Sequence, residues 1–293
     1  MNKPIKMLAG LMLAVTLAGA AAVAAPAVVS ADTATEQSSS SSSTATHTLS
    51  SSYVVYGAGA PQSVYDQLNS VMGVDSSFKK LTATASDYAK YIGNGTTTDA
   101  AMISSVAIAP TDPGSGVKVN IKKYNGQSNI TEVTAQQYAM VAQMAGVTDI
   151  TIVVTANRAV SGESALTGVY KAFEEDGHQL NSQNTAAANS VLDATQDAID
   201  ANKDDSSYPG KLMAAVGDTS KQIAQQKQSS GELATKADIQ EMLNKALEKR
   251  GIADQTTTTQ QEKIAGALVN FQNSPISSSK TYINNVTNTI NNV

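Results

Sequence analysis

The feature that most constrains the fold is a change in the spacing of apolar residues near residue 177. Before it, residues 149–156 (DITIVVTA) are mostly apolar, and residues 117–124 (VKVNIKKY) alternate apolar with polar side chains. The first pattern is typical of a strand in the centre of a sheet, and the second predicts a half-buried strand of an antiparallel pair. After residue 177, apolar residues recur at helical spacing only. This division predicts an α+β fold.

The patterns also divide the chain into regions. Residues 53–180 follow the order strand, helix, helix, strand, strand, helix, strand, helix, which predicts an α+β domain with a small mixed sheet and packed helices. Residues 181–272 carry four amphipathic helices with narrow, alanine-rich apolar stripes. Because such helices bury little alone, we expect this all-helical C-terminal part to pack on the α+β domain or on a partner. Residues 273–293 form an Asn/Thr-rich tail in which a final helix is marginal.

The N-terminus predicts export. Two lysines precede a long apolar run, and the Val-Ser-Ala triplet ending at Ala31 places small residues where a signal peptidase cleaves. We therefore expect residues 1–31 to be a signal peptide that is removed after Ala31. A retained membrane anchor is the alternative, since residues 7–29 are long enough to span a bilayer.

The residues after the signal peptide predict a spacer. Residues 32–52 are rich in Ser and Thr and have almost no apolar bulk, so we expect them to be disordered, with His47 inert among them. The chain has no cysteine, which excludes disulfides and a lipid anchor on cysteine. Export without cysteine is consistent with a Gram-positive bacterium. The expected location is extracellular or associated with the cell wall.

Charge and motifs limit the classes of ligand. The formal net charge is −5, and removal of the signal peptide leaves 18 basic against 25 acidic residues, a net charge of −7. The sequence has no run of Lys or Arg, which disfavours nucleic acid and anionic membranes as partners. The Gly57-Ala58-Gly59 turn lacks the third glycine of a dinucleotide site, and no His-Glu-x-x-His motif occurs. We therefore expect no cofactor and no metal, and as partner a cell-wall component, a protein or a second copy of the chain.

The segment TANRAVSGESALTGVY, residues 155–170, raises the question of a serine nucleophile. Ser164 lies between a predicted strand and a predicted helix, and Gly162 matches the first glycine of a nucleophile elbow, but Leu166 occupies the place of the second. A serine nucleophile also needs a base. His178 is the histidine expected in the ordered part, and a helix of three turns places it about 20 Å from Ser164.

A structural interpretation of the same segment explains more of its residues. Ser161 and Ser164 are suited to accept hydrogen bonds from the free N–H groups at a helix start, and Glu163 lies where the helix dipole favours an anion. Gly162 permits a tight entry from the strand. If a ligand binds at this junction, Arg158 and Glu163 are the side chains expected to contact it.

This segment also carries a resemblance to a known family. SGESALTGVYKAFEEDG, preceded by AGVTDITIVVTANRAV and by SSVAIAP and GVKVNI, resembles domain-of-unknown-function family 1002, the secreted YpuA-like proteins of Firmicutes. The resemblance extends over about residues 53–271, so the serine-rich spacer and the Asn/Thr-rich tail lie outside it. It implies an exported Gram-positive protein with an α+β portion and trailing helices, and it implies no activity.

Two hypotheses from different classes follow. The first is a secreted, non-enzymatic protein of the cell envelope that acts by binding or by self-association. The alternative is an envelope-directed hydrolase that uses Ser164 or a pair of carboxylates, since the separation of two carboxylates cannot be derived from sequence. The absence of an assembled catalytic set and of tryptophan, which often lines carbohydrate clefts, favours the first hypothesis.

Overall fold

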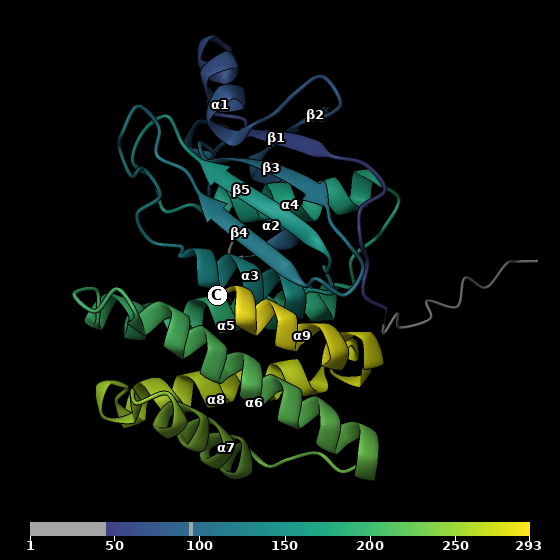
Figure 1. The fold of residues 1–293 in the computed structure, drawn as a ribbon, viewed down its shortest axis with the longest axis vertical. Coiled ribbons are helices and arrows are strands. Elements are labelled where there is room, and N and C mark those ends of the chain that lie inside the picture. The colour runs from purple at the N-terminus through teal and green to yellow at the C-terminus, as the bar shows by residue number, and fades with distance from the viewer. Residues whose placement is uncertain (1–44, 94–95) are drawn as a thin grey trace, which may run out of the picture. The chain divides into compact units, whose positions relative to one another are not determined.

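The computed structural model of the protein describes residues 45–93 and 96–293 (Figure 1). The predicted signal peptide, its cleavage after Ala31 and residues 32–44 of the predicted spacer lie outside the described residues. Within the described ranges, no helix combines the length and the apolar content that a bilayer crossing requires.

A five-stranded mixed sheet organises the N-terminal half, with strand order β2-β1-β3-β5-β4 (Figure 1). β1 runs parallel to β2 and antiparallel to β3, while β5 runs antiparallel to β3 and parallel to β4. This arrangement, followed by helices to the end of the chain, confirms the predicted α+β fold. The strands are β1 Tyr53–Gly57, β2 Lys79–Ala83, β3 Ser105–Pro110, β4 Val117–Ile121 and β5 Ile150–Thr155.

The topology tests three expectations about strands. β5 lies between β3 and β4, which confirms its predicted place inside the sheet. The antiparallel pairing predicted for β4 is wrong, because β4 pairs with β5 in parallel, with Val117 opposite Ile150. Parallel neighbours need a crossover, and helix α3 (Ala135–Met144) supplies it between these strands. The sequence pattern does not predict β2, since Lys79, Lys80 and Thr82 are exposed at the sheet edge.

Helices cover both faces of the sheet. α3 and α4 pack on one face, where they bury the apolar side chains of β1, β3, β4 and β5 in the main core. α1 covers part of the opposite face, where a smaller core joins Leu68 and Met72 to Val54 and Ala107 of the sheet. The helices of this half are α1 Tyr65–Met72, α2 Ala85–Tyr91, α3 Ala135–Met144 and α4 Glu163–Glu175, with 3₁₀ turns at residues 62–64 and 99–101.

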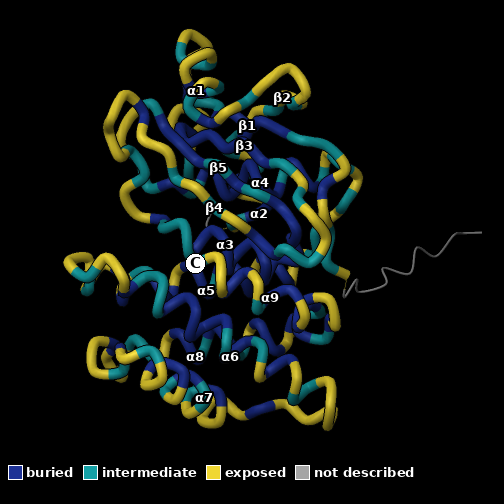
Figure 2. Tube along the Cα trace, viewed as in Figure 1, coloured by how far each residue is buried: buried dark blue, intermediate teal, exposed yellow. Residues whose placement is uncertain are grey.

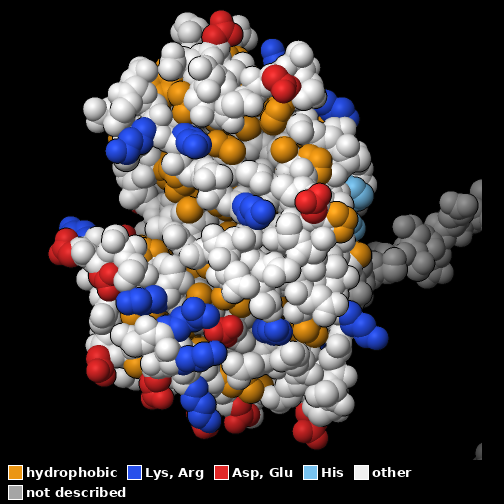
Figure 3. All heavy atoms as spheres, viewed as in Figure 1, with side chains coloured by type: hydrophobic (Ala, Val, Ile, Leu, Met, Phe, Trp, Pro, Cys, Tyr) orange, Lys and Arg blue, Asp and Glu red, His pale blue; other side chains and the backbone are white. Residues whose placement is uncertain are grey.

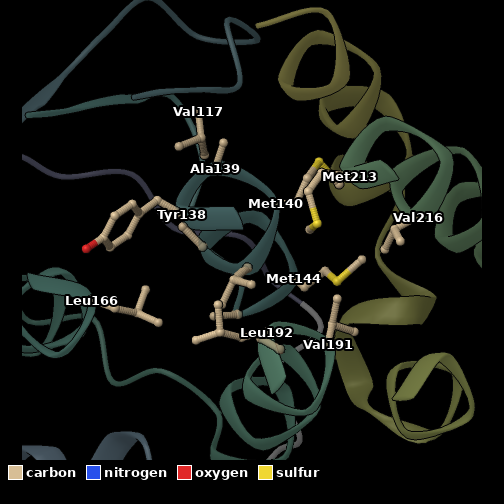
Figure 4. Close-up of a cluster of buried hydrophobic side chains, with 14 of the residues drawn as sticks. Val117, Tyr138, Ala139, Met140, Met144, Leu166, Val191, Leu192, Met213 and Val216 are labelled. Carbon is tan, nitrogen blue, oxygen red and sulfur yellow. The ribbon is translucent and has the colours of Figure 1, made fainter. Parts of the chain in front are cut away.

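α3 connects the sheet to the C-terminal helices. All its residues from Gln137 to Met144 are buried, as expected of a helix that has packed elements on every side. In Figure 4, Tyr138 lies on the side of Leu166 of α4, whereas Met140 and Met144 point toward Met213 of α6. One continuous core therefore extends from the sheet through α3 into the helices, and Figure 2 shows buried stretches in both.

The C-terminal helices use their apolar stripes against this core and against each other. α5, α6 and α9 contact α3, while α7 and α8 pack on α5 and α6. Thr235 and Thr257 form capping boxes that start α7 and α8. The packing on the α+β part is one of the two arrangements expected from the sequence. The helices are α5 Ser182–Ala201, α6 Tyr208–Ser230, α7 Lys236–Lys249, α8 Thr258–Asn273 and α9 Lys280–Asn292, with 3₁₀ turns at residues 253–255 and 275–278.

Both ends of the described chain pack more than the sequence suggested. Residues 45–52 were expected in the disordered spacer, but the backbone of His47 bonds to Gly146 and Thr148 at 2.7 and 3.0 Å. The Asn/Thr-rich tail forms α9, which buries Tyr282 and Val286 against the core. The physical reason is that the partners of both segments come from distant parts of the chain, which local composition does not report.

Candidate functional site at the strand-to-helix junction

The predicted site lies where the chain leaves β5 and enters α4, and Gly162 fixes its geometry. Gly162 is the N-cap of α4 with a φ of 114°, a conformation that favours glycine. The Tyr138 hydroxyl donates to the Gly162 carbonyl at 2.5 Å. A Cβ at this position would lie 2.5 Å from the Tyr138 hydroxyl and 2.8 Å from Cγ2 of Ile130. The junction is therefore packed shut against α3 and the preceding loop.

Ser164 is buried in this junction and bonded to Ser104, with only 8% of its surface exposed. The Ser164 hydroxyl donates to the Ser104 carbonyl at 3.1 Å, and the two hydroxyl oxygens lie 2.5 Å apart. The Ser104 oxygen in turn accepts from the Ala165 N–H at 2.9 Å. A consistent assignment has Ser104 donating to Ser164, so that both hydroxyl protons are used within the pair.

The helix start is organised differently from the expectation. Neither Ser161 nor Ser164 accepts a hydrogen bond as a helix cap, since Gly162 occupies the N-cap position. The side chain of Ser104, directly before β3, performs the capping instead by accepting from the Ala165 N–H. Ser161 contributes its carbonyl instead, which accepts from the Val133 N–H at 3.0 Å. The segment therefore organises backbone, as the structural interpretation predicted, but through different atoms.

Glu163 is the charged side chain at this junction. It lies in the first turn of α4, where an anion is favoured, and its Oε2 accepts from the Tyr88 hydroxyl at 2.9 Å. Burial raises the pKa of Glu163 against the effect of the Tyr88 hydrogen bond, and the charges of Asp193 and Glu132 raise it further. The carboxyl is half-buried, and its surroundings make it easier to protonate than a carboxyl in water.

The remaining predicted residues do not join Glu163 and Ser164 in one site. Arg158 is exposed, and its Nη2 donates to the Ala100 carbonyl at 3.3 Å. His178 lies just beyond the far end of α4, where its ring stacks on that of His47 with 5.0 Å between centroids. Within the described part of the chain, the side-chain hydrogen bonds of Ser164 therefore go to Ser104 and not to an imidazole, an amine or a carboxylate.

A second polar cluster, around Asp176, was not predicted. Its carboxylate accepts from the Ser50 N–H at 2.5 Å, and from the Ser50 and Tyr53 hydroxyls at 2.8 Å each. Burial opposes the charged form of Asp176, but these donors and the nearby His178 lower its pKa overall. The cluster fastens the N-terminal segment to the end of α4. Its partners lie more than 120 residues apart in the sequence, so no local pattern signals it.

The His47–His178 pair completes this cluster. Burial and the neighbouring His178 both lower the pKa of His47, which favours the neutral ring. Among residues 45–93 and 96–293, no group of three or more acidic, histidine or cysteine side chains is arranged to hold a metal ion. The hydrogen bonds of this cluster hold the N-terminal segment against the end of α4.

Comparison with known proteins places the chain in a family. The family model described as Protein of unknown function (DUF1002) matches residues 56–289, so the match includes most of α9 and extends past the expected limit at residue 271. The uncharacterized protein YpuA of Bacillus subtilis (strain 168) is 30% identical over 151 residues, which span 50% of this chain and 50% of that protein. No solved structure matches the chain. The chain therefore belongs to the family of proteins of unknown function DUF1002.

Proposed function

We propose that this protein is an exported, non-enzymatic component of the cell envelope that acts by binding. The observation that carries the proposal is the state of Ser164. Its hydroxyl is buried and bonded within the Ser104 pair, at the segment of the sequence that most resembles a nucleophile elbow. A nucleophile needs an accessible oxygen beside a base. The proposal of export rests on the N-terminal sequence pattern.

The surface supports a polar partner in preference to a second copy of the chain. The apolar stripes of the C-terminal helices are buried where these helices pack on α3 and on one another. Leu233 is the large apolar side chain that the described chain exposes, at 53%. Stable homodimers generally bury an apolar interface. We therefore propose a hydrated cell-wall component as the ligand class, with the chain acting as a monomer.

The test uses the mature chain, residues 32–293, and cell walls isolated from a Gram-positive bacterium. The protein is mixed with walls, sedimented and eluted with salt, while light scattering after size exclusion gives its oligomeric state. We expect retention on the walls, a monomeric mass and no release of soluble wall fragments. Ser164→Ala is the matched control and should be retained as strongly as the wild type. Failure of the wild type to sediment with walls at low salt, or release of wall fragments that Ser164→Ala abolishes, would contradict the proposal.

A further inference from the structure

Two neighbouring cavities follow helices α6 and α7, and together we call them the α6–α7 groove. The first, about 370 Å³, lies at the start of α6 and includes Lys211 and Arg250 in its lining. The second, about 300 Å³, lies farther along α6 and includes Lys221, Lys245 and Lys249. Figure 3 shows several Lys and Arg side chains over α6 and α7 on the face in view, with Asp and Glu side chains among them.

An ion pair links the two cavities. Nη2 of Arg250, which lines the first cavity, donates to Asp218 of the second at 2.7 Å. Asp218 supplies the acidic side chain in the lining of the two cavities, and Val293 brings its backbone carboxyl group to the first, against five cations. Asp205 interacts electrostatically with Lys211, and its carboxylate accepts hydrogen bonds from the N–H and hydroxyl of Ser207.

Three lysines of the groove keep their charge available. Within the described ranges, no carboxylate lies within ion-pair distance of Lys211, Lys221 or Lys249. Nζ of Lys221 donates to the neutral Thr287 hydroxyl at 2.7 Å. Lys245 pairs with Glu241 one helical turn away, an exposed pair that water screens strongly. Basic side chains therefore outnumber acidic ones in the lining of the groove, on a chain whose net charge is −5.

The spacing of these cations selects a ligand with several negative charges. Lys211 and Lys221 are ten residues apart on α6, which separates them by about 15 Å along the helix axis. One phosphate cannot contact both, whereas an extended chain of phosphates reaches both cavities. Repeated phosphate contacts also give the salt-dependent affinity of polyanion binding.

The other lining groups indicate which further chemical groups the ligand carries. Gln222, Gln225, Ser206 and Ser207 place amides and hydroxyls beside the cations, and such groups bond to the hydroxyls of a polyol. The lining contains no aromatic ring on which nucleobases stack. Leu233, in the loop between α6 and α7, is a single exposed apolar side chain. Insertion into a membrane surface requires a larger apolar area than one such side chain supplies.

We propose that the α6–α7 groove binds a linear polyol-phosphate polymer, with phosphodiesters contacting the cations of both cavities and polyol units contacting the amides and hydroxyls beside these cations. This inference rests on the proposed function, because an exported envelope protein meets such polymers in the wall. Folding brings together cations that the sequence keeps apart.

The probe is purified poly(glycerol phosphate), and the protein is the mature chain, studied by titration calorimetry at low and at physiological salt. We expect binding that weakens as salt rises. Lys211→Gln combined with Lys249→Gln removes one unpaired cation from each cavity and should weaken binding about tenfold and flatten the salt dependence. Lys118→Gln combined with Lys122→Gln makes the same charge change at exposed positions of the β4 edge and should leave binding unchanged. Circular dichroism verifies that both variants fold.

Four outcomes would overturn the inference. They are no binding of the polymer at low salt, equal weakening by the β4-edge variant, equal affinity for polyglutamate or single-stranded DNA, and binding to phosphatidylglycerol vesicles without binding to the polymer. A second sedimentation experiment, with walls stripped of their phosphate polymers, distinguishes failure of this inference from failure of the proposed function. Retention on stripped walls without polymer binding rejects the inference alone, whereas absence from native walls rejects the proposed function.

Discussion

The pair formed by Ser104 and Ser164 allows a quantitative test of whether the junction is structural. Ser164→Ala leaves the Ser104 carbonyl without its hydroxyl donor and strands the Ser104 proton in a buried site. A buried hydrogen bond contributes about 0.5–1.5 kcal/mol net, and a stranded group adds to that cost, so we expect a loss of about 1–2 kcal/mol. Ser104→Ala leaves the Ala165 N–H with the Gly162 carbonyl alone and should cost about 1 kcal/mol.

The double variant distinguishes a coupled pair from two independent side chains. With both hydroxyls absent no proton is stranded, so the double variant should lose about 0.5–1.5 kcal/mol less than the two single losses together. Urea unfolding followed by far-UV circular dichroism measures all four proteins under the same conditions. Strict additivity, or single losses that are both within error of zero, would refute the bonded pair and with it the structural role of Ser164.

Three further perturbations test neighbouring features. Gly162→Ala combines a left-handed φ with a Cβ only 2.5 Å from the Tyr138 hydroxyl, so thermal unfolding should report a loss of about 2–5 kcal/mol; a loss below about 1 kcal/mol contradicts the closed junction. Burial raises the pKa of Glu163 above 4.5, so its charged form opposes folding increasingly as pH rises. Glu163→Gln keeps an acceptor for Tyr88 and should match wild type below pH 4.5 but exceed its unfolding free energy at neutral pH; a deficit at neutral pH contradicts this. Burial and the stacked neighbouring ring lower the pKa of His47 below 6.5, so wild-type stability should fall as pH decreases below 6.5. His47→Gln should lessen that fall, and parallel pH profiles would contradict the packing of the N-terminal segment.

Much of the fold follows from the sequence because hydrophobic period is a local signal. The mostly apolar run of β5 and the helical spacing after residue 177 suffice to predict the fold class. The direction of a strand does not follow from this period. β4 alternates apolar with polar side chains, a pattern typical of antiparallel strands, yet it pairs with β5 in parallel. α3 shows a related limit. Its sequence suggests one apolar face, yet Gln137 and Gln143 are also buried because they bond to Thr195 and Thr289.

α9 shows why polar composition misleads. Its Asn and Thr residues argue for a marginal tail, but Asn285 donates to Thr148 at 3.1 Å and Thr289 bonds to the Val117 N–H at 3.0 Å. A buried polar group is tolerated when it finds a hydrogen-bond partner, and the partners of Asn285 and Thr289 named here lie more than 130 residues away. Local propensity cannot report such contacts.

The candidate site likewise has a part that the sequence predicts and a part that it does not. The sequence indicates a helix start at Gly162 and Ser164, because a glycine after a strand pattern and before a helical pattern is a local signal. It does not indicate Ser104, which lies 60 residues earlier and performs the capping. The α6–α7 groove is equally hidden, since its five cations are distributed between residues 211 and 250 and meet only when α7 packs on α6.

The most direct measurement of the central claim is labelling of the folded protein, residues 32–293, with a fluorophosphonate probe, with Ser164→Ala beside it. The buried hydroxyl, bonded within its serine pair, predicts that neither protein is labelled under conditions that label a known serine hydrolase to completion. Labelling of the wild type that disappears in Ser164→Ala would show an accessible, activated oxygen and would contradict the account.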